Sequence, residues 1–368
     1  MFKQRLVVRV NADRQWLLML VAFGVAVVGT RVFLEAAGYP QIGNSQLHFA
    51  HALWGGLLQF IALCIFLTYA NRWAYSFSAA VGGVGVGLFI DEVGKFITQT
   101  NDYFFPFAAP IIYAALLLTA LLYLWTRLQR PQSPRALLYY ALEQLKNIVD
   151  HDLDLRERTE IAAALHQVIG VSNSAEQQKI ARVLLELVSE ATLIPAPKPG
   201  VFKRAIDALK SLEERFFSRA TANILLLLAF AWNSIGGAVL LSALLMLFSN
   251  AQAQIVEPMF FSQSFEVSTD TAQWVLAHAL LTLIIGVLYF VAAILLLIRR
   301  ERSAIYLARI ALALQLTLAN MLGFYFNQFA MVSATLIEVT ILIMVERYKA
   351  RFLDRKILKT PSLDIVQS

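Results

Sequence analysis

The chain has 368 residues, of which 58% are hydrophobic and only 15% are charged, and its formal net charge is +6 at pH 7. Soluble domains carry about a quarter charged residues, so this composition excludes an ordinary soluble protein. The single cysteine, Cys64, excludes an intrachain disulfide and a cysteine-rich metal site.

Apolar residues gather in eight stretches, each near the length that a bilayer requires of a helix. They are residues 16–36, 48–69, 78–98, 107–125, 222–248, 271–298, 304–326 and 329–345. Because lipid offers the backbone no hydrogen-bond partner, they predict an all-α polytopic membrane protein with about eight transmembrane helices. We expect the first stretch to be a span and not a cleaved signal peptide, because Arg31 and Glu35 interrupt it.

Lysine and arginine lie on one side of the predicted spans. Segments 37–47, 99–106 and 249–270 contain neither residue. The opposite connections carry Arg72, Arg127, Arg130, Arg299, Arg300, Arg302, Arg347, Lys349 and Arg351. The positive-inside rule therefore predicts the inner membrane of a bacterium with both termini cytoplasmic, and these flanks explain the net charge without a nucleic-acid partner.

A long polar segment separates the first four spans from the last four. We divide the chain into spans 1–126, a cytoplasmic insert 127–221, spans 222–346 and a cytoplasmic tail 347–368. Apolar residues at helical spacing predict a small helical bundle in the insert. They are Leu137, Leu138, Ala141, Leu142, Leu145, Ile161, Leu165, Val168, Ile169, Ile180, Val183, Leu184 and Leu187. Residues 201–217 are predicted to form an amphipathic helix that ends the insert.

Polar and ionisable side chains inside the spans mark the candidate site, because such groups are costly in lipid. Most of them lie within about 10 Å of the outer membrane boundary by helix rise. The candidate pocket consists of His48, His51, Asp91, Glu92, Lys95, His278, Asn320 and Glu338. Glu338 lies near the middle of its span, so we expect it to be protonated or paired with His278 or Asn320.

Two histidines begin the second span. His48 and His51 are three residues apart and therefore share a helix face. Together with Glu92 they suit a divalent metal such as zinc. The same groups also suit proton transfer, because imidazole changes charge near neutral pH.

A purely structural interpretation also fits. The i,i+4 spacing of Asp91 and Lys95, and of Arg31 and Glu35, is typical of ion pairs within one helix. Because adjacent residues diverge on a helix, we expect only one of the two neighbouring carboxylates to reach a given pocket. We predict that Asp91 pairs with Lys95, and that the next residue, Glu92, pairs with His51.

Glycines in the third span predict close helix packing. Gly83 and Gly87, four residues apart, form a small-residue face. We expect this face to contact the second span, which contains Gly55 and Gly56.

The run Leu47-His48-Phe49-Ala50-His51, followed by Gly85-Val86-Gly87-Leu88-Phe89-Ile90-Asp91-Glu92, resembles a pattern in uncharacterised bacterial polytopic membrane proteins. In those proteins a histidine-rich helix start precedes a glycine-rich helix that ends in Asp-Glu. The resemblance covers about the first 125 residues and implies no established activity. The histidines are also more distantly similar to those of membrane hydrolases that hold zinc between helices. Such enzymes have a late His-x-x-x-His, which this sequence lacks.

These features predict an integral membrane protein with an outward-facing pocket that transports or binds a small solute or ion. One alternative is a metal-dependent membrane enzyme that uses His48 and His51 with Asp91 or Glu92. Another is a membrane scaffold whose insert recruits a cytoplasmic protein partner. The spans imply the lipid bilayer as a partner, and a homo-oligomer is compatible with the sequence.

Overall fold

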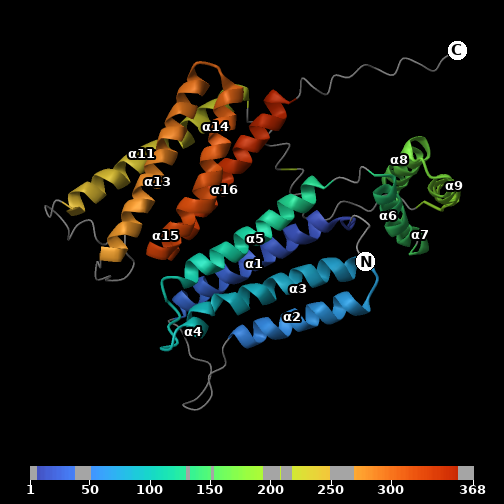
Figure 1. Ribbon diagram of the computed structural model, residues 1–368, viewed down its shortest axis with the longest axis horizontal. Coiled ribbons are helices and arrows are strands. Elements are labelled where there is room, and N and C mark those ends of the chain that lie inside the picture. The colour runs from blue at the N-terminus through green and yellow to red at the C-terminus, as the bar shows by residue number, and fades with distance from the viewer. Residues whose placement is uncertain are drawn as a thin grey trace. The chain divides into compact units, whose positions relative to one another are not determined.

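The computed structural model describes residues 6–37, 51–129, 133–150, 153–193, 208, 218–248 and 269–354. Throughout this part of the chain the regular elements are helices (Figure 1). Eight helices are long and apolar enough to cross a membrane. The predicted all-α architecture and the number of spans are therefore confirmed, and the chain is a multi-pass integral membrane protein.

The spans follow the chain in order, and their bounds are close to the predicted ones. The first four are α1 (Ala12–Ala36), α2 (His51–Thr68), α3 (Arg72–Asp91) and α5 (Ala108–Leu128). The last four are α11 (Arg219–Phe248), α13 (Thr269–Leu297), α14 (Glu301–Leu314) with α15 (Asn320–Phe326), and α16 (Gln328–Tyr348). Two π-helical segments, η1 (Gln315–Ala319) and η2 (Lys349–Leu353), join α14 to α15 and extend α16.

The third span differs most from its prediction. It starts at Arg72 instead of residue 78, and it ends at Asp91 instead of residue 98. Glu92 leaves the helical conformation, with φ −90° and ψ 10°, and the short helix α4 (Val93–Ile97) follows. The break falls at the two neighbouring carboxylates, and it changes which way they point.

The chain divides into two compact units. The first comprises residues 1–93 and 115–204, and the second comprises residues 94–114 and 205–368. In the first unit, α3 packs against both α1 and α2 (Figure 1). In the second, α13 packs against α11 and α14, and α16 packs against α11 and α14.

Glycines on two sides of α3 allow both of its neighbours to come close. Gly83 and Gly87 face α1, where a Cβ at Gly83 would lie 2.5 Å from the carbonyl oxygen of Met19. The prediction that this face contacts α2 is therefore wrong. Gly85 faces α2 instead, and a Cβ there would lie 2.8 Å from the carbonyl oxygen of Gly55. Glycines two positions apart on α3 therefore contact different helices.

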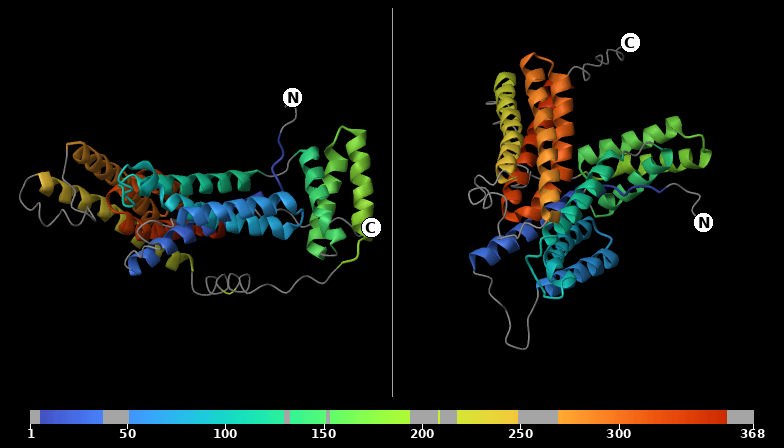
Figure 2. Two further views of the ribbon diagram at one scale, coloured as in Figure 1. Left: turned by 90° about the horizontal axis from the view of Figure 1, so that it is seen from below. Right: turned by 60° about the vertical axis from the view of Figure 1, so that its left-hand side comes forward.

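In the described residues of the insert there are four helices: α6 (Pro134–Gln144), α7 (Lys146–Val149), α8 (Leu155–Val171) and α9 (Ala175–Glu190). Three of them, α6, α8 and α9, pack on one another (Figure 2). The core that they share consists of Leu137, Leu138, Ala141, Leu153, Ile161, Ala164, Leu165, Val168, Ala181 and Val188. The helical nature of the insert is confirmed, whereas the amphipathic helix predicted at 201–217 lies outside the described residues apart from Ala208.

Helix α9 presents a different face to this core from the one its apolar pattern predicts. Ile180, Val183 and Leu187 are 40%, 57% and 50% exposed, so their predicted place in the core is wrong. Ala181 and Val188 are buried instead. Apolar residues come in adjacent pairs along this helix, so periodicity alone does not choose between the two faces.

Because α2 and α3 approach closely, we expect an added methyl group between them to destabilise the protein. A Cβ at Gly55 would lie 2.5 Å from the backbone nitrogen of Phe89, whereas a Cβ at Gly56 would meet nothing within 4 Å. We expect Gly55→Ala to destabilise the protein by about 1–3 kcal/mol through overpacking, measured by thermal unfolding in detergent. Gly56→Ala on the same helix is the matched control and should change the stability little. Equal effects of the two substitutions would contradict this packing.

Candidate functional site

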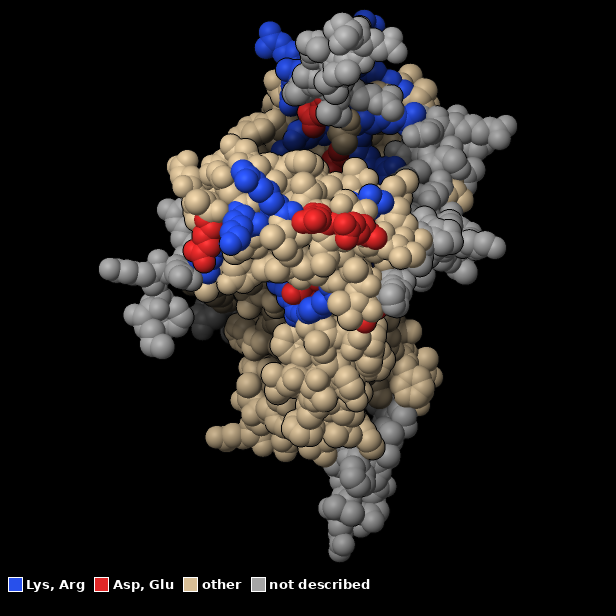
Figure 3. Space-filling model, turned by 90° about the vertical axis from the view of Figure 1, so that its right-hand side faces the viewer, with Lys and Arg blue, Asp and Glu red and all other residues tan. Residues whose placement is uncertain are grey.

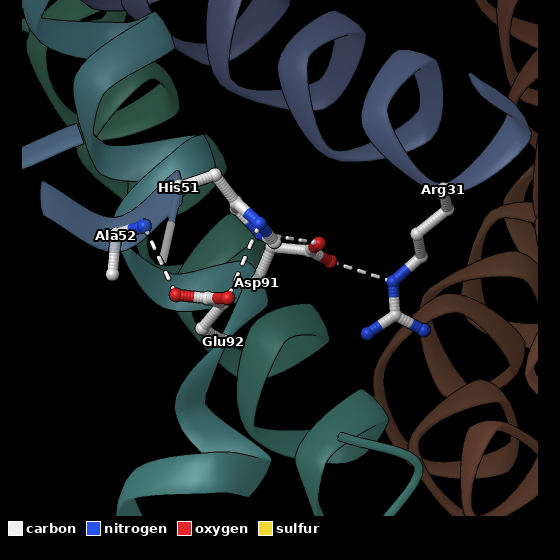
Figure 4. Close-up of polar contacts among 5 residues, drawn as sticks. All are labelled: Arg31, His51, Ala52, Asp91 and Glu92. Atoms are coloured by element: carbon white, nitrogen blue, oxygen red, sulfur yellow. Dashed lines mark hydrogen bonds and ion pairs between the residues drawn. The ribbon is translucent and has the colours of Figure 1, made fainter. Parts of the chain in front are cut away.

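Three helices of the first unit bring four ionisable side chains together (Figure 4). Arg31 comes from α1, His51 is the first residue of α2, Asp91 is the last residue of α3, and Glu92 follows it. The Arg31 Nε atom donates a hydrogen bond to Asp91 Oδ1 at 2.6 Å. We call these four residues the first polar cluster.

The imidazole of His51 contacts both carboxylates. Its Nε2 lies 3.2 Å from Asp91 Oδ2, and its Nδ1 lies 3.2 Å from Glu92 Oε1. The backbone N–H of Ala52 donates to Glu92 Oε2 at 3.0 Å. The predicted contact between His51 and Glu92 is therefore confirmed.

The prediction that only one of the two carboxylates reaches the pocket is wrong. Consecutive residues on a regular helix point about 100° apart. Glu92, however, lies just beyond the end of α3, where its backbone is no longer helical. Its carboxylate can therefore approach one ring nitrogen of His51 while Asp91 approaches the other.

Burial differs among the members of the cluster. Asp91, Glu92 and Arg31 are buried, and the side chain of His51 is 21% exposed. Two ionised carboxylates are expensive in such a site unless they are compensated by charge or hydrogen bonds. Arg31 and the Ala52 N–H supply part of that compensation, and His51 is the member that is most accessible.

Arg31 is the functional candidate that sequence reasoning assigned elsewhere. Its spacing predicted a pair with Glu35, whose side chain lies outside the described residues, and its Nε atom contacts Asp91, sixty residues away. Lys95, the predicted partner of Asp91, has its ammonium 5.4 Å from the ring centroid of Tyr103. The pair of Arg31 with Asp91 could have been predicted from the topology. The first and third spans both end at the same membrane surface, and each of these residues lies near the end of its span.

A second polar cluster lies in the second unit. Glu338 of α16 accepts hydrogen bonds from Asn320 Nδ2 and from Gln315 Nε2, the latter at 3.1 Å. Asn320 also donates to the Thr335 hydroxyl at 3.0 Å. Both Asn320 and Glu338 are buried. The predicted pairing of Glu338 with Asn320 is therefore confirmed.

The π-helical segment η1 aligns two of these donors. The N–H of Asn320 donates to the carbonyl of Gln315, five residues earlier, as expected of a π-helix. Gln315 and Asn320 are thus one π-turn apart and share a face, from which both reach Glu338. Such segments occur often at functional sites.

The predicted pocket residues therefore gather in two clusters. His51, Asp91 and Glu92 meet in the first unit, and Asn320 and Glu338 meet in the second. His278 of α13 lies with its ring centroid 5.8 Å from that of Phe326. His48 lies outside the described residues.

The predicted metal site stays a prediction. Within the part of the chain that the structure describes, no group of three or more His, Cys, Asp or Glu side chains has an arrangement suited to a metal ion. The proposed ligand set was His48, His51 and Glu92, of which the first is not described. Of the set, His51 and Glu92 lie in direct contact with each other.

Comparisons with known proteins found no matching protein family, no similar curated protein and no similar solved structure. The resemblance of the first 125 residues to uncharacterised bacterial membrane proteins therefore stays a prediction. Functional inference for this chain depends on the geometry of its own residues.

Because the Arg31–Asp91 pair is buried, we expect a substitution at Asp91 to lower the stability of the protein strongly. Asp91→Asn should destabilise the protein by about 3–5 kcal/mol, because it leaves the Arg31 charge buried without its carboxylate. The control is the exposed Arg156–Glu160 pair of the insert, whose N–O distance is 2.9 Å. Glu160→Gln should change the stability little, because water already screens that pair. Thermal unfolding in detergent measures both, and similar small losses would contradict the burial of the cluster.

Proposed function

We propose that the protein transports or binds a small cationic solute or ion, in exchange for protons, at the first polar cluster. The observation that carries this proposal is the contact of one partly accessible imidazole, His51, with two buried carboxylates. Ionisable groups within membrane spans commonly serve proton relays and ion pathways.

Charge balance supports an exchange of protons for cations. Arg31 donates to Asp91, and Glu92 lies against the imidazole of His51 and the N–H of Ala52. These four side chains together carry a net charge of −1 with a neutral imidazole, and zero with a protonated one. A net charge is costly in the interior of a membrane protein. Either a proton on His51 or a monovalent cation beside Glu92 brings the net charge of the cluster to zero. The proton and the cation therefore compete for the cluster.

The position of His51 supports a route for both species. It begins α2 at the end of a span, and it is the most exposed member of the cluster. Asp91 and Glu92 lie behind it and are buried. A proton or cation from the adjoining aqueous phase therefore meets the imidazole first.

We also propose that this end of α2 faces outward and that the insert, 127–221, is cytoplasmic. The connections at this end contain one basic residue, Lys95, whereas Arg72, Arg127 and Arg299 lie at the other end of their spans. The positive-inside rule supports this orientation in a bacterial inner membrane.

The exchange is testable in proteoliposomes that contain a pH-sensitive dye. An imposed sodium or potassium gradient should drive proton movement through the wild-type protein. His51→Ala and Glu92→Gln should each reduce this flux at least about tenfold, as expected when an essential proton-transfer group is removed. The apparent affinity for the cation should rise with pH, because fewer protons compete for the cluster.

The matched control is His166→Ala, which removes an exposed histidine of the insert and should leave the flux unchanged. Absence of cation-driven proton flux in the wild-type protein would contradict the exchange. Elemental analysis tests the alternative enzyme. Stoichiometric zinc that is retained by the wild type and lost in His51→Ala would instead favour a metal-dependent reaction.

The orientation is tested by reporter fusions in bacterial cells. Fusions in the segments that lack lysine and arginine, after Gln46, Asn101 and Gln263, should be extracytoplasmic. Fusions after Arg130, Arg302 and Lys356 should be cytoplasmic. A cytoplasmic signal at Gln263 would contradict the orientation of the last four spans.

A further inference from the structure

One end of the second unit contains a cavity lined by arginines. Its volume is about 770 Å³, and its lining includes Arg219, Arg299, Arg300, Glu301, Arg302 and Leu353. These residues belong to the start of α11, the turn from α13 into α14, and the end of η2. Figure 3 shows lysine and arginine side chains, in blue, gathered in the upper part of the face.

The charge of this cavity is strongly positive. Its lining contains four arginines and one glutamate, which gives a net charge of +3. Arg219 pairs with Glu301. Among the described residues, no hydrogen bond or ion pair engages the guanidinium groups of Arg299, Arg300 and Arg302. Three guanidinium groups in one cavity therefore have their donors available to a ligand.

The backbone of the turn shows a conformation that arginine rarely adopts. Arg299 has a φ of 62°. The N–H of Arg299 donates to the carbonyl of Leu296 at 3.1 Å, and the N–H of Arg300 donates to the carbonyl of Leu295 at 2.8 Å. This pair of bonds is a Schellman motif, and its left-handed position normally holds glycine. An arginine there costs conformational free energy, which points to a use for its side chain.

The start of α14 adds backbone donors to the same cavity. Arg300 is the N-cap residue, and no side chain caps this end of the helix. Glu301, Arg302 and Ser303, the first three residues of α14, all line the cavity. Their backbone N–H groups lack partners within the helix, and the N-terminus of a helix favours an anion.

We propose that this cavity binds a phosphate group. Guanidinium groups match phosphate oxygens with paired hydrogen bonds, and several arginines compensate the charge of a phosphate. The cavity lies where α11 and α14 begin and α13 ends, which is the level of lipid headgroups at a membrane surface. The phosphate comes either from the headgroup of an anionic phospholipid or from a soluble phosphate compound. This site is independent of the first polar cluster and of its proposed exchange function.

The lipid source is tested with protein in nanodiscs of phosphatidylcholine that contain increasing fractions of phosphatidylglycerol. Native mass spectrometry after release counts the retained phosphatidylglycerol. Arg302→Gln should weaken its binding about fivefold, because it removes from the cavity one guanidinium group that pairs with the phosphate. Arg127→Gln is the matched control, because Arg127 is an exposed arginine at the end of α5 that bonds to Tyr123. It should weaken binding less than twofold.

The soluble source is tested with inorganic phosphate and delipidated protein in detergent. A rise in melting temperature with phosphate, beyond that with chloride of equal ionic strength, and lost in Arg302→Gln, would identify a soluble phosphate ligand. Retention of phosphatidylglycerol without a phosphate-dependent rise in melting temperature would identify the lipid headgroup as the ligand. The proposal is overturned when Arg302→Gln and Arg127→Gln behave alike in both assays. The melting temperature of each variant without ligand reports whether it is folded.

Discussion

The ion pair between Arg31 and Asp91 is the interaction on which the first unit depends. Inside a bilayer a buried carboxylate has no water to stabilise it, so it requires a cation or hydrogen-bond donors from neighbouring helices. Arg31 of α1 and His51 of α2 supply these to the end of α3. Glycines on two sides of α3 let both helices approach closely enough for these contacts. Polar compensation and close packing therefore hold the same three helices together.

The two polar clusters satisfy their carboxylates differently. In the first, charged and titratable partners surround Asp91 and Glu92, and the imidazole of His51 is partly accessible. In the second, the amides of Gln315 and Asn320 donate to Glu338. Amides do not change charge, whereas an imidazole does so near neutral pH. This difference is why we assign proton exchange to the first cluster and a role in helix packing to the second.

Each cluster lies at an interruption of regular helix. Helix α3 ends just before Glu92, and η1 interrupts the seventh span beside Asn320. Irregular backbone within a membrane is tolerated where other groups satisfy its carbonyls and N–H groups. The hydroxyl of Tyr113 donates to the carbonyl of Leu316 within η1. These interruptions align side chains that a regular helix would direct apart.

The sequence by itself determined the all-α class and the eight spans, because span length and hydropathy can be read along the chain. It also identified His51, Asp91, Glu92, Asn320 and Glu338 as candidates, because polar and charged side chains are costly in lipid. It offered Asn320 as one of two possible partners of Glu338, beside His278, and it paired Glu92 with His51. Only the tertiary structure decided that Arg31 contacts Asp91, that Gly83 faces α1 and that Ile180 is exposed on α9. Each of these depends on how a helix is rotated about its axis, which packing against neighbours sets and hydropathy does not.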